Sequence, residues 1–156
     1  MCSSVLRPSL SPYESYPIHQ LLEKVAKLNG DRTAVVDGDR SFTYSALHNL
    51  SSRFASVLLD QGAKKGDRIG ILAPNCVEFV IAFYGITGSG CVVTTINSGY
   101  REREIAHQVS DSGCEIMVVH ESLSQVLNAA FEITGREVKT IVITGESHHP
   151  GSFWNL

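Results

Sequence analysis

The chain has 156 residues, of which 43% are hydrophobic and 19% charged, and its formal net charge at pH 7 is −3. These values are typical of one globular domain, and the slight negative charge gives no reason to expect nucleic acid or an anionic membrane as a partner. The sequence has no uninterrupted run of about 18 apolar residues, so no transmembrane helix is predicted. Residues 1–15 carry Ser and Pro but no apolar signal-peptide core, and we expect a flexible lead-in there.

The first predicted element is a helix over residues 15–29, where apolar side chains recur at helical spacing. His19 lies near its start, and we interpret it as a solvated or capping imidazole rather than a catalytic one. Residues 33–44 predict a β-hairpin, with Asp37-Gly38 as the signal for a type I′ turn. The acidic residues at 37–39 are interpreted as part of that turn, because the other ligands of a calcium loop are missing. A longer helix is then predicted over residues 43–61, capped by its first residue, Thr43.

A strand-helix-strand unit forms the centre of the predicted fold. Residues 68–73 are apolar and rich in β-branched side chains, and residues 91–96 predict a second strand. Between them, Asn75 and Glu78 suggest a capping box for a helix that is apolar on nearly every side, and is therefore expected to be buried on all sides. A crossover helix of this kind predicts a parallel sheet covered on both faces.

The remaining elements continue the alternation of helix and strand. They are a helix over 100–113, a strand over 115–119, a helix over 121–135 and a strand over 140–144. The predicted fold class is therefore three-layer α/β, with a mostly parallel sheet, helices on both faces and an N-terminal β-hairpin. We divide the chain into a flexible lead-in (1–15), an α/β subdomain (16–145) and a truncated loop (146–156).

The four cysteines, Cys2, Cys76, Cys91 and Cys114, form no C-x-x-C pair and have no histidine at zinc spacing. Cys91 and Cys114 lie where strands are expected to begin, and a small thiol packs there as a hydrophobic side chain. We therefore expect structural thiols in a reducing compartment, and we place the chain in the cytoplasm.

No motif for a reaction centre is found. Gly85, Gly88 and Gly90 have the reverse spacing of the dinucleotide-binding fingerprint and precede a strand, so we interpret them as turn glycines. The sequence contains neither a P-loop signature nor a G-x-S-x-G elbow. His148-His149 is a weak candidate for a metal pair, and the charges at 101–104 are interpreted as a solvated helix start. We accordingly expect no catalytic, cofactor-binding or metal-binding residue in this chain.

Three segments resemble the N-terminal part of the AMP-forming acyl-CoA synthetases, the adenylate-forming ligases that include coumarate-CoA ligases and luciferase. They are FTYSAL at 42–47, GDRIGILAPNCVEF at 66–79 and GCVVTTINSGYREREI at 90–105. Two positions depart from the pattern of that family: Ala46 stands where glutamate is usual, and Ser98 replaces a proline. The resemblance covers roughly residues 16–144, which is nearly all of the chain that we expect to be ordered.

What the resemblance implies is a two-step ligase of fatty acid metabolism. A carboxylate attacks the α-phosphate of ATP to give an acyl-adenylate, with magnesium, and the thiol of CoA then displaces AMP. In that family the phosphate loop, the ribose-binding aspartate and the mobile domain with its lysine lie downstream of the segment seen here. No basic residue occurs between His120 and Gln125, where some relatives contact CoA. ATP, Mg²⁺ and CoA are therefore implied for a full-length parent, and no cofactor is expected in this chain.

These features predict a fragment that is inactive by itself. Its expected partners are the remaining subdomains of a full-length ligase or a second copy, with Phe153 and Trp154 as candidates for the exposed surface. A parent of this type could also be peroxisomal, since such an address would lie at its C-terminus. The main alternative is a non-catalytic α/β module that binds a partner protein. A small nucleotide-binding flavodoxin-like domain is less favoured, because no strand-to-helix turn carries a phosphate loop.

Overall fold

The structure is a computed structural model that describes residues 16–144 and the backbone of Trp154 and Asn155. The helices are α1 (Ile18–Asn29), α2 (Tyr44–Asp60), α3 (Val77–Gly88), α4 (Glu102–Ser112) and α5 (Ser124–Thr134), with a 3-10 turn, η1, at Glu121–Leu123. The strands are β1 (Thr33–Asp37), β2 (Arg40–Thr43), β3 (Arg68–Leu72), β4 (Val92–Ile96), β5 (Ile116–His120), β6 (Lys139–Ile143) and β7 (Trp154–Asn155).

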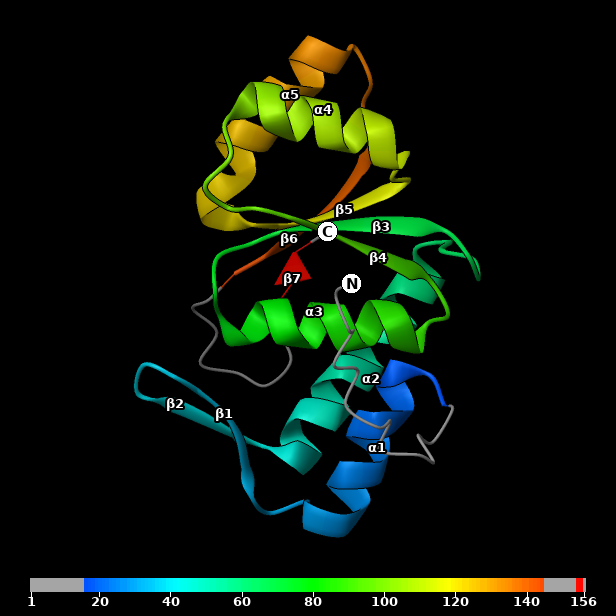
Figure 1. Cartoon of the computed structure of the whole chain (residues 1–156), viewed down its shortest axis with the longest axis vertical. Coiled ribbons are helices and arrows are strands. Elements are labelled where there is room, and N and C mark those ends of the chain that lie inside the picture. The colour runs from blue at the N-terminus through cyan, green and yellow to red at the C-terminus, as the bar shows by residue number, and fades with distance from the viewer. Residues whose placement is uncertain (1–15, 145–153, 156) are drawn as a thin grey trace, which may run out of the picture.

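A five-stranded sheet in the order β4-β3-β5-β6-β7 forms the middle of the molecule, and its first four strands are parallel. The crossover from β3 to β4 runs in one direction along the sheet, and the crossover from β4 to β5 runs in the other. Because crossovers of the usual right-handed sense then place their helices on opposite faces, α3 lies on one side and α4 and α5 on the other (Figure 1). The sheet is therefore covered on both faces.

The predicted fold class is confirmed, and two further helices add to it. α2 packs along the side of α3 that faces away from the sheet, and α1 packs against both (Figure 1). The hairpin β1–β2 forms a separate two-stranded sheet beside them. The short strand β7, which pairs antiparallel with β6, falls in a segment for which the sequence predicts a loop.

The hydrophobic core consists of two clusters, one on each face of the sheet, because side chains of a strand alternate between faces. On β3, Ile69 and Ile71 join the cluster with α2 and α3, whereas Leu72 joins the cluster with α4 and α5. On β5, Val118 and Met117 divide in the same way. A sheet buried on both faces explains why these strands are apolar throughout.

The expectation that α3 is buried on all sides is wrong. Its Ile81 and Ile86 are buried, but Phe79, Val80 and Phe83 are only partly buried. The helix is apolar all round, yet no element of the described chain covers these three side chains completely. Part of the apolar surface of α3 is thus open to solvent.

The close approach of α2 and α3 depends on one glycine. A Cβ atom placed on Gly85 would lie 2.8 Å from Phe54 Cδ1 and 2.9 Å from the Ser51 carbonyl oxygen, both on α2. Any side chain at this position would push the two helices apart. Gly90, in contrast, has φ +82° in the turn from α3 to β4, which agrees with its interpretation as a turn glycine.

The predicted capping box of α3 is also wrong. Cys76 is the N-cap residue and makes no side-chain capping bond. The backbone N–H of Val77 instead donates to Asp37 Oδ2 on the hairpin at 3.1 Å. Glu78 is buried, and its carboxylate accepts a bond from Arg40 Nη1 at 2.7 Å rather than turning back to the helix.

The hairpin turn differs from the prediction as well. Asp37 pairs with Arg40, which makes Gly38 and Asp39 the two central residues. A type I′ turn needs positive φ at both, but only Gly38 has it, at +59°. Glycine at the first central position with positive φ there alone is the pattern of a type II′ turn. The helix cap predicted at Thr43 is confirmed, since its Oγ1 accepts a bond from the Ala46 N–H at 3.2 Å.

Candidate functional site

A cleft of about 360 Å³ lies beyond the carboxyl ends of β3 and β4, and we call it the strand-end cleft. Its lining residues, which carry no charged side chain, are Ala73, Asn75, Phe79, Thr95, Ile96, Asn97, Ser98, Tyr100 and Gln108. β3 and β4 are adjacent and parallel, so their carboxyl ends bring the segments that follow them to one edge of the sheet. In open α/β sheets ligands bind at this kind of edge.

The turn after β4 is held in shape by Asn97. Its Oδ1 accepts a bond from the Gly99 N–H at 2.9 Å, and its carbonyl oxygen accepts one from the Tyr100 N–H at 3.1 Å. α4 then begins with the Arg101 N–H donating to Glu104 Oε2 at 3.1 Å, which supports the predicted helix start. This local bonding fixes one wall of the cleft.

Gln108, on α4, lies on the wall of the cleft. Its Oε1 is buried and has no hydrogen-bond partner among the residues that the structure describes. A buried carbonyl oxygen without a donor is costly, and such groups call for an explanation. The Gln108 side chain therefore places an amide group at the wall of the strand-end cleft, with its oxygen buried beneath the surface.

A group of charged side chains joins the hairpin to the start of α3. Arg40 pairs with Asp37 and with Glu78, and Glu78 is only 2% exposed. The bond from the Val77 N–H, assisted by Arg40, holds the pKa of Asp37 below its usual range. The bond to Glu78 in turn raises the pKa of Arg40. We interpret these contacts as structural, since both carboxylates bond to the one Arg40 guanidinium.

Cys76 lies next to this group. Burial raises the pKa of its thiol to about 11, and the negative charge of Glu78 acts in the same direction. The thiol therefore stays protonated near neutral pH and is a poor nucleophile. Cys91 and Cys114 are buried, as expected for packing thiols. Cys2, like His148 and His149, lies outside the described residues.

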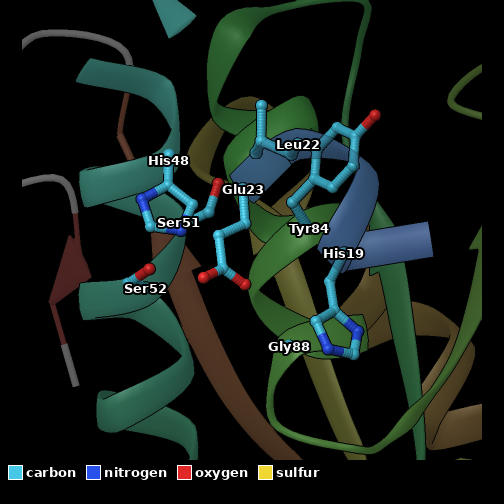
Figure 2. Close-up of a pocket in the computed structure, with 8 residues that line it drawn as sticks. All are labelled: His19, Leu22, Glu23, His48, Ser51, Ser52, Tyr84 and Gly88. Carbon is cyan, nitrogen blue, oxygen red and sulfur yellow. The ribbon is translucent and has the colours of Figure 1, made fainter. Parts of the chain in front are cut away.

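A second, smaller pocket of about 160 Å³ lies between α1, α2 and α3 (Figure 2). His19 and Glu23 from α1 line it together with His48 and Ser51 from α2 and Tyr84 from α3. Glu23 is paired with Lys27 Nζ at 2.6 Å, and that bond lowers its pKa.

Across the described ranges, 16–144 and 154–155, no three His, Cys, Asp or Glu side chains are arranged to hold a metal ion. The two histidines and the carboxylate of the smaller pocket are thus not a metal site. None of the helices in the described part of the chain has the length and apolar character that a membrane crossing needs.

The residues of the strand-end cleft were not predicted from the sequence. The positions of Asn75 and Asn97 could have indicated the cleft, because each follows a strand that was predicted to belong to one parallel sheet. Gln108 carries no such signal, since its position depends on how α4 packs. The expectation that the chain holds no catalytic or cofactor-binding residue remains a prediction.

Comparison with known proteins identifies the family. The family model described as AMP-binding enzyme matches residues 22–152, which is most of the chain. The chain belongs to the AMP-binding enzyme family. The resemblance noted in the sequence is thereby confirmed.

Two curated CoA ligases that match the chain are much longer than it. A long-chain-fatty-acid–CoA ligase of Salmonella typhimurium is 29% identical over 136 residues, covering 86% of this chain and 24% of the relative. A 4-coumarate–CoA ligase of Pinus taeda is 31% identical over 139 residues, covering 87% of this chain and 25% of the relative. The chain thus spans about a quarter of the length of these curated relatives.

Solved structures of the family have the same fold. The N-terminal domain of FACL13 from Mycobacterium tuberculosis superposes with a TM-score of 0.75 at 30% identity, covering 83% of this chain and 34% of that one. A benzoate CoA ligase from Burkholderia xenovorans LB400 gives a TM-score of 0.74 at 22% identity, over 84% of this chain and 26% of that one. The described fold is therefore an N-terminal part of the AMP-binding architecture.

Proposed function

We propose that this chain is the N-terminal portion of an ATP-dependent carboxylate–CoA ligase, and that it does not catalyse the ligase reaction by itself. The observation that carries the proposal is the family match over residues 22–152, combined with coverage of about a quarter of each ligase relative. The reaction of the parent would be adenylation of a carboxylate followed by thioester formation with CoA.

The side chains of the strand-end cleft support the second half of the proposal. Transfer at a phosphate requires positioned cations, backbone donors and metal ligands around the charged oxygens. No lysine, arginine or carboxylate lines the strand-end cleft. The residues present there do not fit a magnesium-bound triphosphate, so we assign no step of the reaction to this chain.

ATP–pyrophosphate exchange tests the proposed inactivity. The purified chain is incubated with ATP, Mg²⁺, labelled pyrophosphate and a panel of aromatic and fatty acids, and a full-length 4-coumarate–CoA ligase is the positive control. We expect exchange at the level of a blank without enzyme for every acid. Exchange that depends on the acid and is lost on heat denaturation of the chain would disprove the inactivity.

A second candidate function is a non-catalytic interaction module. An apolar groove of about 240 Å³ lies between the hairpin and α3 and is lined in part by Val36, Phe79 and Val80. Light scattering after size exclusion separates the two candidates. A stable monomer over a wide concentration range would favour a self-contained module, whereas association would favour a portion that lacks its neighbouring subdomains.

A further inference from the structure

The strand β4 forms one edge of the main sheet. We propose that β4 pairs antiparallel with the β4 strand of a second copy of this chain, so that two main sheets join into one continuous sheet across a two-fold axis. The proposal goes beyond the proposed ligase function and does not depend on it. It is carried by the unpaired edge of β4, by the absence of charge on this strand and by its self-complementary sequence.

The described chain leaves the outer edge of β4 open. β4 comes first in the strand order β4-β3-β5-β6-β7, and within residues 16–144 and 154–155 it pairs with β3 alone. An edge strand presents a row of unpaired backbone N–H and C=O groups. Val92 is 51% exposed and Thr95 is also exposed, whereas residues 116–119 of the interior strand β5 are all buried. A further strand can therefore reach β4.

The features that usually protect an edge strand are missing from β4. Soluble proteins block such edges with charged residues, with proline or with a β-bulge. The sequence of β4 is VVTTI, which contains no charged residue and no proline. Its register with β3 is continuous from end to end, so no bulge bends it away. All of its residues are β-branched and favoured in strands. β4 is thus suited to accept another strand.

A second copy of the chain is the partner that fits this strand. A charged strand would require a partner of opposite charge, whereas a strand without charge is complementary to itself. Two identical strands related by a two-fold axis perpendicular to the sheet run antiparallel and keep each face of the sheet on the same side. In the register that pairs the whole strand, Thr94 lies opposite its own copy. Val92 then lies opposite Ile96, and Val93 lies opposite Thr95.

The two faces of the joined sheet agree with this register. Val93 is in register with Ile69 of β3 and packs on the face that α3 covers. Ile96 is in register with Leu72 and packs on the face that α4 covers. Because the axis preserves the faces, each cluster of one copy is continued by the same cluster of the other. Cross-strand pairs of β-branched side chains stabilise neighbouring strands.

Aromatic side chains beside β4 extend the apolar surface. Phe79 of α3 lines the strand-end cleft together with Thr95, and Phe83 follows Phe79 by one turn on the same side of that helix. Both rings are only partly buried. A contact based on one short strand and its flanks is nevertheless small, so we expect a weak dimer with a Kd on the order of 10–100 µM.

Sedimentation equilibrium of the purified chain over a range of concentrations tests the pairing. Thr95→Lys should raise the Kd of the dimer by about tenfold or more, because the lysine would lie opposite Val93 of the second copy. Asn128→Lys is the matched control, since it adds the same charge at an exposed position on α5 and should leave the Kd unchanged. Circular dichroism checks that both variants are folded. A monomer at millimolar concentration, or an equal effect of the two lysines, would overturn the proposal.

This dimer would form under either candidate function. Light scattering that compares the two functions is therefore carried out on the Thr95→Lys chain, in which pairing through β4 is weakened.

A disulfide cross-link tests the register. In the proposed pair the two copies of Thr94 lie directly opposite each other, within the distance that a disulfide can span. Oxidation of Thr94→Cys by diamide should give a covalent dimer joined at position 94, which mass spectrometry identifies. Asn128→Cys should give no more covalent dimer than the parent chain, which controls for the native cysteines. Equal yields of covalent dimer from Thr94→Cys and Asn128→Cys would refute the proposed pairing.

Discussion

At the scale of single residues, the arrangement of greatest interest is the buried carboxylate of Glu78. A carboxylate that is 2% exposed loses most of its hydration and must be matched by a partner, which here is Arg40 from the hairpin. Arg40 is partly exposed, so it keeps some contact with water when its partner is removed. Removal of the charge should therefore cost less than it would for a fully buried pair.

The variant Glu78→Gln keeps the shape of the side chain and removes its charge. We expect it to lower the free energy of unfolding by about 1–2 kcal/mol, measured as a shift of the urea midpoint followed by circular dichroism. Glu23→Gln is the matched control, because Glu23 is also paired with a cation, Lys27, but on the open surface. An equal shift for both variants would show that burial of Glu78 has no energetic consequence.

Asp37 makes a pH-dependent contribution to the stability of the fold. Its pKa is lowered in the folded state by the Val77 N–H and by Arg40. A depressed carboxyl pKa stabilises the fold above the unfolded pKa of about 4, and that stabilisation is lost as the pH falls through the lower, folded value.

We therefore expect Asp37→Asn to lose less stability than the parent between pH 5 and pH 2, measured by urea unfolding at each pH. Asp39→Asn, an exposed neighbour in the same turn, should follow the parent curve. Parallel curves for the parent chain and Asp37→Asn would rule out the assigned role. Glu23, whose pKa is also lowered, contributes to the loss of stability at low pH in the parent chain and in both variants.

At the scale of elements, the sequence predicts the order of helices and strands well, because each element carries its own periodicity. The cap at Thr43 was predictable for the same reason, since the capping group and the N–H are three residues apart. The cap of α3 was not, because its carboxylate comes from Asp37, 40 residues earlier in the chain. A nearby Asn75 and Glu78 gave the pattern of a local capping box, but the charge of Arg40 attracts Glu78 away from the helix end.

The same distinction applies to the strand-end cleft. Asn75 and Asn97 come together because β3 and β4 pair, and that pairing follows from the predicted parallel sheet. Gln108 joins them through the packing of α4, which no local pattern specifies. The sequence therefore predicts where such a cleft lies and not the full set of side chains that line it.

The contact between α2 and α3 gives a prediction at the element scale. In Gly85→Ala the added methyl group would meet Phe54 and the Ser51 carbonyl at less than 3.0 Å, so the helices must separate. We expect a loss of about 1–3 kcal/mol in the free energy of unfolding, from urea denaturation. Gly88→Ala is the control, because a methyl group there meets only Ala55 Cβ at 3.9 Å. Equal effects of the two substitutions would contradict tight packing at Gly85.

At the scale of the whole molecule, part of the apolar surface of the described chain is not covered by any other element of it. Phe79 and Val80 on α3 are half-buried, and Val36 on the hairpin is 69% exposed. The two-stranded hairpin sheet has no further strand in the described chain, so both of its strands have an unpaired edge there. Both features favour association of the chain with another polypeptide or with a second copy.

We expect the mass of the purified chain, measured by light scattering, to rise above the monomer value as its concentration increases. Val36→Lys should reduce this association, because a lysine on the strand opposes pairing and apolar contact. Leu28→Lys is the control, since Leu28 is 72% exposed but lies on α1. A monomeric mass at all concentrations, or an equal effect of the two substitutions, would show that the hairpin does not drive association.

The strand order described above also bears on how the chain forms during synthesis. β3 is the first strand of the main sheet to leave the ribosome, and it ends up between β4 and β5, which follow it. β6 then pairs with β5. Each of β4, β5 and β6 therefore pairs with a strand that was synthesised before it. The strand order therefore allows the parallel part of the sheet to form outward from β3 during synthesis, since none of its strand pairs involves a residue downstream of β6. A ligase built on this plan would have its first α/β layer in place while most of its chain was still to be translated.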